Sequence, residues 1–286
     1  MSILKILVLA LIQGAGELLP VSSSAHVIVA EKLMGLDPTA PEMTLLLVML
    51  HTGTMFAVIF YFWKSWKDHY FSSGPVFWNF AKRVIVATGL TGVVGLTLKF
   101  LIEKFALKDT PHAEIELIFG NLALIGISLG AVGLLIIYAG IRVERSHRPY
   151  HADLRGSSLI GIVQGICLPF RGFSRSGATI SVGLLLGITK ERVEEFSFAL
   201  AVVLTPPVIV REIVRLLKAR AVSLPHHADV FALLYPSLLG MVCSFLAGLL
   251  ALRWLSRWLE QGRWHFFGIY CLLAAAGVLW LYKLGY

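Results

Sequence analysis

The chain has 286 residues, of which 57% are hydrophobic and 15% are charged, and its mean hydropathy is +0.78. A soluble domain carries about 25% charged residues, so this composition excludes an ordinary soluble protein and indicates a membrane protein. The net charge of +8 does not indicate nucleic-acid binding. The basic residues cluster between apolar segments, as the positive-inside bias of cytoplasmic loops produces.

Along the chain, six apolar segments approach or exceed the roughly 20 residues that a bilayer-crossing helix needs. Backbone groups in lipid must be hydrogen-bonded internally, so long apolar runs of this kind form helices. The segments are 44–63, 84–101, 115–141, 196–217, 229–252 and 265–284. We therefore predict an all-α integral membrane protein with about six full transmembrane helices.

Two further regions, 1–36 and 156–188, do not fit a full crossing. The first apolar arm, 3–12, would reach only about 15 Å at about 1.5 Å per residue, half the hydrocarbon thickness. A re-entrant helix–loop–helix that enters and leaves on one side of the membrane fits this length better. Irregular backbone at that depth is tolerated only where it is buried in protein or faces a polar cavity.

The two regions resemble each other. Each runs from an apolar segment through Gln-Gly and Leu-Pro to a serine cluster; the matching pairs are Gln13-Gly14 with Gln164-Gly165, Leu19-Pro20 with Leu168-Pro169, and Ser22-x-Ser24 with Ser174-x-Ser176. Glycine and proline interruptions at matching places in two halves of a membrane protein indicate a binding site near the midplane of the bilayer, between the repeats. We predict one membrane domain made of halves 1–150 and 151–286, each a re-entrant unit followed by three spans.

Three spans is an odd number, so the second unit enters from the opposite face and the repeat is inverted. The basic loops 64–83 and 142–155 are predicted to be cytoplasmic, which brings the first unit in from outside and the second from inside. The basic residues of 211–220 disagree with this orientation.

Glu17 follows Gln13 by four residues, so both side chains lie on one face of a helix. An ionisable residue inside a membrane is costly and usually functional. A carboxylate and an amide oxygen are hard ligands that suit Mg²⁺ or Ca²⁺, so we predict that Glu17 and Gln13 hold a divalent cation. The alternative is an interfacial glutamate that reaches water. His51, within an apolar run, is interpreted as a polar contact that supports the site.

Ser22, Ser23, Ser24 and His26 follow Pro20, at the start of the next predicted helix. Hydroxyls and free backbone N–H groups at a helix start form an anion site. A histidine beside a serine can act as the general base or as the nucleophile. The candidate nucleophiles are Ser23, Ser22, His26 and a water molecule activated by His26. The alternative is that the serines only cap the helix while His26 packs at an interface.

Arg175 lies in the stretch GFSRSGAT, and an arginine in the middle of a membrane repeat needs an anionic partner. Its guanidinium fork matches phosphate oxygens, so we predict that it binds phosphate. The hydroxyls that would assist it, and the glycine that would permit close backbone approach, are Ser174, Ser176, Thr179 and Gly172. The alternative is a structural ion pair, with Glu17 as the partner.

These residues resemble the undecaprenyl-pyrophosphate phosphatase family of bacterial inner membranes, which is associated with bacitracin resistance. The family's first motif, Glu/Gln-x-x-x-Glu followed by Leu-Pro-Val-Ser-Ser and a histidine, matches residues 13–26. Its second motif, Pro-Gly-x-Ser-Arg-Ser-Gly-x-Thr, matches residues 171–179. The resemblance spans the whole chain. Two positions depart from it: Gln13 stands where many members have glutamate, and Arg171 replaces the proline.

The resemblance implies hydrolysis of undecaprenyl pyrophosphate to undecaprenyl phosphate and inorganic phosphate, which recycles the lipid carrier of peptidoglycan. It also implies a multi-pass protein of the inner (plasma) membrane, a site open to the periplasmic side, and a divalent cation. The expected partners are a polyprenyl pyrophosphate and membrane lipids. The assembly is left open between a monomer and a homodimer.

The working hypothesis places the prenyl chain in an apolar groove and the pyrophosphate where the two units meet. Glu17, Ser23, His26 and Arg175 are the predicted catalytic residues, with Ser23 assisted by His26. A transporter or translocase of phosphate or a lipid phosphate is the competing class, because inverted repeats with broken helices also build transporters. A phosphatase for other lipid pyrophosphates is a third reading.

Overall fold

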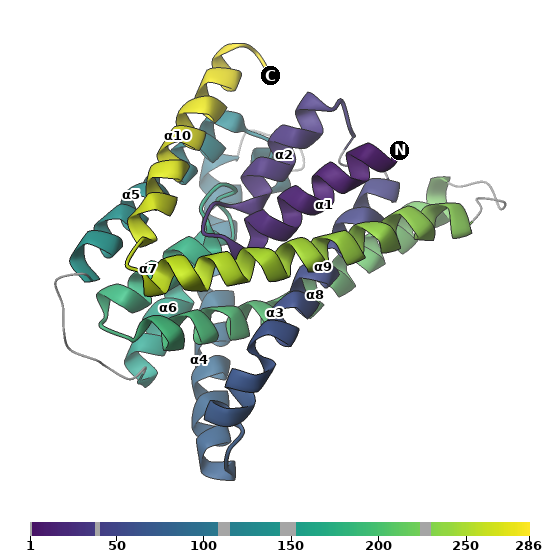
Figure 1. Cartoon of the computed structure of the whole chain (residues 1–286). Helices are drawn as coiled ribbons and strands as arrows, with labels where there is room; N and C mark the ends of the chain where they lie inside the picture. The colour runs from purple at the N-terminus through teal and green to yellow at the C-terminus, as the bar shows by residue number, and fades with distance from the viewer. Residues whose placement is uncertain (1, 38–40, 108–114, 144–152, 224–229) are drawn as a thin grey trace.

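Figure 1 presents the computed structural model, which describes residues 2–37, 41–107, 115–143, 153–223 and 230–286. Every regular element within these ranges is helical, as predicted. In chain order the elements are α1 (Ile3–Leu18), α2 (Ser23–Leu33), α3 (Pro41–Tyr70), α4 (Gly74–Leu101), the π-helical turn η1 (Ile102–Ala106), the 3₁₀ turn η2 (Ile115–Ile118), α5 (Leu122–Val143), α6 (Leu154–Cys167), α7 (Arg175–Leu185), α8 (Lys190–Ser223), α9 (Val230–Glu260) and α10 (Trp264–Lys283).

Six helices in the described part of the chain are long and apolar enough to cross a membrane, which confirms a multi-pass membrane protein. Their apolar stretches are Met43–Tyr70, Gly74–Phe105, Leu122–Arg142, Lys190–Arg211, Tyr235–Glu260 and Trp264–Lys283. Each overlaps one predicted span. The predicted boundary between halves at residue 150, and the basic residues of 144–150, lie outside the described residues.

The third span begins later than the predicted residue 115, because Asn121 starts a new helix there. Its side-chain oxygen accepts a hydrogen bond from the Leu124 N–H at 3.1 Å, and its carbonyl accepts one from the Ile125 N–H at 3.0 Å. Asparagine is among the preferred helix-capping residues. The apolar residues before it form η2 instead of extending α5.

The first helix is longer than the predicted arm 3–12 and continues through the polar segment to Leu18. Two glycines let it pack closely against its neighbours. A Cβ added at Gly14 would lie 2.7 Å from the Ser244 carbonyl oxygen on α9, and one at Gly16 would lie 3.0 Å from the Ser23 Cα on α2. The 16 residues of α1 extend about 24 Å, still short of the roughly 30 Å hydrocarbon core.

Two pairs of short helices, α1–α2 and α6–α7, occupy the regions where half-crossings were predicted. The second pair has helices of 14 and 11 residues. Side-chain caps begin both of its helices: Asp153 accepts from the Gly156 N–H at 2.7 Å, and Ser174 accepts from the Gly177 N–H at 3.2 Å. Such caps satisfy backbone donors that have no partner inside the helix.

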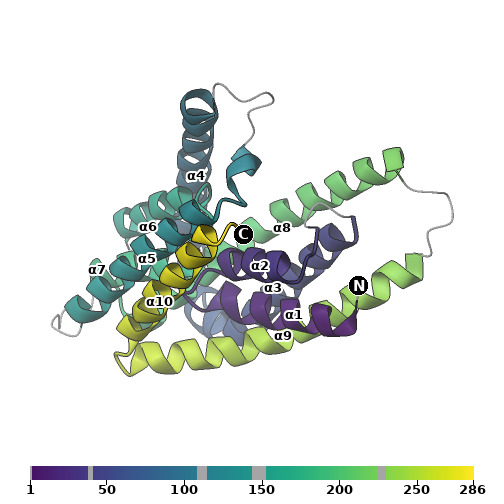
Figure 2. The same cartoon turned by 90° about the horizontal axis from the view of Figure 1, so that it is seen from above.

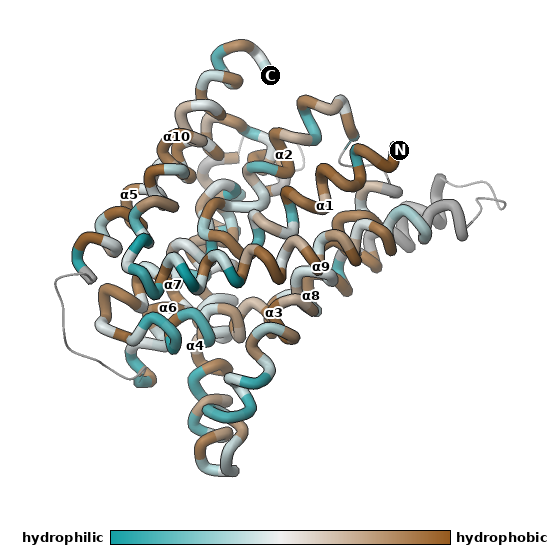
Figure 3. Tube along the Cα trace, viewed as in Figure 1, coloured by the Kyte–Doolittle hydropathy of each residue, from teal (hydrophilic) through white to brown (hydrophobic). Residues whose placement is uncertain are grey.

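The long helices pack in pairs around these short ones. In Figure 2 α5 runs beside α10. These two helices are in extensive contact, as are α3 with α9 and α4 with α6. Figure 3 shows hydrophobic positions along α1, α5 and α10 and hydrophilic ones toward the C-terminal end of α9. Large apolar side chains face outward, including Phe60 and Leu96 at 70% exposure. A soluble protein rarely exposes so much apolar surface, so these faces contact lipid.

Candidate active site

The predicted site residues lie where the α1–α2 turn meets the α6–α7 turn. The Ser176 hydroxyl donates to the Leu19 carbonyl at 3.2 Å, and this bond is buried. The Arg175 guanidinium reaches across the same junction to Glu17, at 3.0 Å. The two motifs, more than 150 residues apart in sequence, therefore form one cluster.

Glu17 is the centre of this cluster. Its Oε1 accepts from the Arg175 Nη2 at 3.0 Å. Its Oε2 accepts from the Ser23 hydroxyl at 2.6 Å and from the Gln13 amide at 3.2 Å. The His51 Nε2 lies 3.9 Å from the same oxygen, in the supporting position that the sequence indicated. One carboxylate thus joins the amide, the hydroxyl and the guanidinium.

Arg175 has donor capacity left over. Its Nη2 pairs with Glu17, whereas its buried Nη1 has no hydrogen-bond partner. Buried donors in folded proteins are nearly always satisfied, so an orphan needs an explanation. An anionic oxygen bound beside Glu17 would satisfy it with a charge-assisted hydrogen bond. The ion pair with Glu17 and an additional phosphate contact are therefore compatible.

The start of α2 carries backbone strain. Ser22 has φ of +66°, and among the described residues other than glycine it alone has a positive φ. Its hydroxyl lies 3.3 Å from that of Ser24 and does not cap the helix. The first N–H groups of α2 have no carbonyl partner within the helix. Strained backbone of this kind persists where surrounding structure enforces it, commonly at functional sites.

His26 does not hydrogen-bond Ser23. Its Nδ1 lies 2.8 Å from the Ser22 carbonyl and its Nε2 lies 2.8 Å from the Tyr270 hydroxyl. The two rings also stack, with centroids 5.7 Å apart. The predicted Ser23–His26 pair is absent because Ser23 bonds Glu17 instead, and both ring nitrogens are engaged elsewhere. Tyr270 was missed, since a tyrosine within an apolar span carries no signal in the sequence.

The other residues of the second motif bond to protein. Ser174 caps α7, and Thr179 bonds the Arg175 carbonyl at 2.8 Å and the Ser197 hydroxyl at 2.6 Å. Gly172 has φ of +95°, and a Cβ there would lie 2.4 Å from the Ile125 carbonyl oxygen. Together with Ser176 these residues fix the loop that positions Arg175. The hydrogen bonds of their hydroxyls go to protein groups other than Glu17, and their role as phosphate donors stays a prediction.

Arg171, which departs from the family motif, has partners of its own. Its guanidinium lies 4.4 Å from the centroid of the Phe119 ring and interacts electrostatically with Glu31 on α2. Glu31 is 4% exposed. Arg171 therefore links the α6–α7 loop to α2.

The donor set fits a divalent cation that is held partly by the substrate. Glu17 supplies one carboxylate, and the neighbouring Gln13 is 1% exposed and supplies an amide. Mg²⁺ is commonly bound by one or two carboxylates together with substrate phosphates. Among the residues that the structure describes, no group of three or more His, Cys, Asp or Glu side chains forms a complete protein cage. Gln13 and Glu17 are the residues of this site that could hold such a cation, and the prediction that they do so stays untested.

The structure is that of a multi-pass membrane protein. At the junction of its two pairs of short helices it holds a cluster of a carboxylate, a hydroxyl and a guanidinium with an unused donor. The chain belongs to the bacitracin resistance protein BacA family, whose model matches residues 6–277. It is similar to Undecaprenyl-diphosphatase 2 of Acinetobacter baylyi, with 57% identity over 284 residues that cover 98% of each chain. Undecaprenyl-diphosphatase 2 proteins of Burkholderia orbicola and Burkholderia thailandensis are 34% identical over 292 residues, 96% of this chain and 95% of each relative.

Proposed function

We propose that this protein hydrolyses undecaprenyl pyrophosphate to undecaprenyl phosphate and inorganic phosphate, recycling the lipid carrier for cell-wall synthesis. The names of its full-length relatives give the substrate. The observation that carries the chemistry is the cluster of Glu17, Ser23 and Arg175, with one guanidinium nitrogen still unsatisfied. Arg171, turned toward Phe119 and Glu31, is not assigned to the substrate.

The proposed nucleophile is Ser23. Its hydroxyl donates to Glu17 at 2.6 Å, the contact expected between a nucleophile and its general base. Ser23 Oγ attacks the terminal phosphorus and its proton passes to Glu17, while the bond to the bridging oxygen breaks and undecaprenyl phosphate leaves. The departing undecaprenyl phosphate takes that proton from Glu17, which is again a carboxylate. Water then attacks the phosphoserine and gives one proton to Glu17, which passes it to Ser23 Oγ as the phosphoserine bond breaks and phosphate departs. One water molecule is consumed per turnover.

Positioning and charge stabilisation dominate phosphoryl transfer. Arg175 holds the terminal phosphate through its free Nη1, and the N–H groups at the start of α2 face the same anion. Gln13 and Glu17 would hold a Mg²⁺ or Ca²⁺ ion, which would offset the charge of the pyrophosphate. His26, bonded to the Ser22 carbonyl and to Tyr270, holds the strained turn in place.

The membrane arrangement is part of the proposal. The α1–α2 and α6–α7 pairs are re-entrant units of halves 1–150 and 151–286 that enter from opposite faces. The short length of α1 and the matching motifs support this arrangement. The site opens to the periplasmic side of the bacterial inner membrane. The basic residues of 211–220 remain at odds with this orientation.

A groove between α3 and α9 fits the prenyl chain. It encloses about 440 Å³ and is lined by Phe56, Ile59, Phe60, Trp63 and Phe245, with Lys64 beside them. Phe56 follows the site residue His51 by five positions on α3. The aromatic side chains face outward, with Phe60 70% exposed. A prenyl chain that reaches this groove would find apolar contact along its aromatic lining.

The test is phosphate release from undecaprenyl pyrophosphate by the purified full chain in detergent micelles. Ser23→Ala and Glu17→Gln should each lower kcat/KM by about a thousandfold or more, the scale for loss of a nucleophile or its base. Ser158→Ala and Glu191→Gln, at exposed positions, should retain it. Near-native turnover in both site variants would overturn the assignment of these residues. No phosphate release by the native protein would favour a transporter instead.

A further inference from the structure

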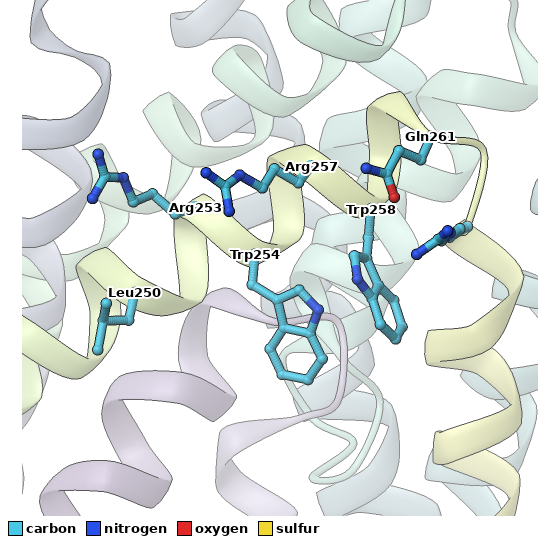
Figure 4. Close-up of a pocket in the computed structure, with 7 residues that line it drawn as sticks. Leu250, Arg253, Trp254, Arg257, Trp258 and Gln261 are labelled. Atoms are coloured by element: carbon cyan, nitrogen blue, oxygen red, sulfur yellow. The ribbon is translucent and has the colours of Figure 1, made fainter.

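A cationic groove lies at the C-terminal end of α9, apart from the candidate active site. It encloses about 450 Å³ and is shown in Figure 4. The side chains that carry the argument are Arg253, Arg257, Arg263, Trp254, Trp258 and Gln261. The proposed hydrolysis uses none of them.

Helical spacing arranges this groove in two parallel rows. Residues four apart lie on one face of a helix, so Arg253, Arg257 and Gln261 form one row. Leu250, Trp254 and Trp258 form the adjoining row, as Figure 4 shows. The first row offers guanidinium and amide donors, and the second offers apolar surface, with Leu250 68% exposed. The groove is therefore amphipathic along its length.

The aromatic row is held in place before any ligand binds. The Trp254 and Trp258 rings meet edge to face with centroids 5.0 Å apart. Trp258 also packs against Phe267 at 5.2 Å and Phe266 at 5.9 Å, both on α10. The aromatic surface of the groove is therefore preorganised, which reduces the entropy lost when a ligand binds.

The three arginines of the groove are not engaged in side-chain ion pairs within the described residues, and Arg253 interacts only electrostatically, with Tyr61. Within the described residues, no side-chain hydrogen bond or ion pair joins Arg253, Arg257 or Arg263 to another group, whereas Arg175 and Arg192 are both paired with glutamates. Glu260, on the same turn of chain, is the one acidic residue between Arg257 and Arg263. The groove thus keeps a net positive charge and unused bidentate donors, which match a phosphate group.

We infer that this groove binds the phosphodiester headgroup of an anionic phospholipid. It lies where the apolar stretch Tyr235–Glu260 ends, at the depth where headgroups contact a membrane protein. The arginine row takes the phosphate, and one acyl chain lies along Trp254 and Leu250 toward the bilayer interior. Basic pockets on the cytoplasmic side of membrane proteins bind anionic lipids in this way. A soluble anion would leave the apolar row uncovered.

The test measures lipid retention by the full chain. The protein is purified with dioleoyl phosphatidylglycerol or dioleoyl phosphatidylcholine, and bound lipid is counted by native mass spectrometry across a lipid titration. The native chain should bind phosphatidylglycerol more tightly. Arg253→Gln with Arg257→Gln should weaken that binding about tenfold or more, since each basic side chain near a membrane contributes about one factor of five. Phosphatidylcholine binding should not change.

Lys82→Gln with Arg83→Gln is the matched control, because it removes the same charge at the basic end of α4. Its phosphatidylglycerol binding should stay within about twofold of the native value, as expected for charges that do not line the groove. Thermal unfolding in detergent without added lipid should be unchanged in both pairs, which excludes misfolding as the cause.

Three results would overturn the inference. One is equal affinity of the native chain for the two lipids. The second is equal loss in the groove and control variants, which would reduce the effect to net charge. The third is displacement of the lipid by millimolar glycerol phosphate, which would make the groove a site for a soluble phosphate.

Discussion

Replacing Arg175 with methionine keeps an unbranched apolar stem and removes the cation that faces Glu17. The Arg175 and Glu17 side chains are 19% and 23% exposed and meet at 3.0 Å, so the pair is largely withdrawn from water. Breaking a fully buried pair by removing one partner lowers stability by about 3–5 kcal/mol. Residual exposure reduces that figure, so we expect Arg175→Met to lower the free energy of unfolding by about 2–4 kcal/mol.

The double variant, Arg175→Met with Glu17→Gln, removes both charges and leaves no isolated ion. Most of the lost stability should return, which gives a coupling free energy of about 2 kcal/mol or more between the two positions. Phosphate release should stay absent, because the base and the phosphate clamp are both gone. Thermal unfolding in detergent and phosphate release from undecaprenyl pyrophosphate, measured on the same preparations, provide the two readouts.

The two readouts separate a structural role from a chemical one. If the ion pair only holds the two turns together, the double variant regains both stability and turnover. Turnover near the native rate in that variant would therefore refute the chemical role of Glu17 and Arg175. Native-like unfolding of the Arg175→Met single variant would refute the claim that the pair is withdrawn from water.

Other outcomes are equally specific. Gly172→Ala should destabilise the protein by about 2 kcal/mol or more in thermal unfolding, because the residue has φ of +95° and a backbone carbonyl oxygen would lie 2.4 Å from the new Cβ. Gly277→Ala on α10 is the control, because a Cβ there meets nothing within 4 Å. It should be neutral or stabilising by about 0.5–1 kcal/mol in the same assay. Tyr270→Phe keeps the stacking but deletes the hydroxyl that meets His26, so kcat should fall about tenfold with KM little changed, the scale of one lost positioning hydrogen bond. Phe60→Ala should raise KM for the C55 substrate about fivefold or more and leave a C15 pyrophosphate unaffected, because only a long chain reaches the groove. A chelator should abolish turnover, and added Mg²⁺ or Ca²⁺ should restore it; full activity in excess chelator would exclude the cation from the mechanism.

The helical class and the six spans could be predicted because length and hydropathy alone require them. The ends of helices were less predictable. Asn121 caps the start of α5 within a segment whose hydropathy predicts one continuous helix. The helix α1 continues through Gln13 and Glu17, where Gly14 packs against α9. When neighbouring helices bury a polar residue in the middle of a helix, the sequence alone suggests that the apolar segment ends at that residue.

The site was predictable in membership and only partly in contacts. Helical spacing correctly suggested that Gln13 and Glu17 share a face. The ion pair of Arg175 with Glu17, which the sequence offered as the alternative to phosphate binding, is present in the structure. The direction of the Ser23 side chain could not be predicted from helical spacing, because the positive φ of Ser22 changes the course of the chain in the turn between α1 and α2. The contact between His26 and Tyr270 depends on how α10 docks.

The ion pair between Glu17 and Arg175 also determines what an empty site contains. A guanidinium inside a membrane protein without an anion would be strongly unfavourable, and Glu17 supplies that anion from within the chain. If phosphate binds Arg175 as proposed, its departure leaves the guanidinium paired with Glu17, and the protein does not have to hold a bare positive charge there. The resident carboxylate is an internal counter-ion on Nη2, so the release of phosphate costs Arg175 only the contact made by Nη1.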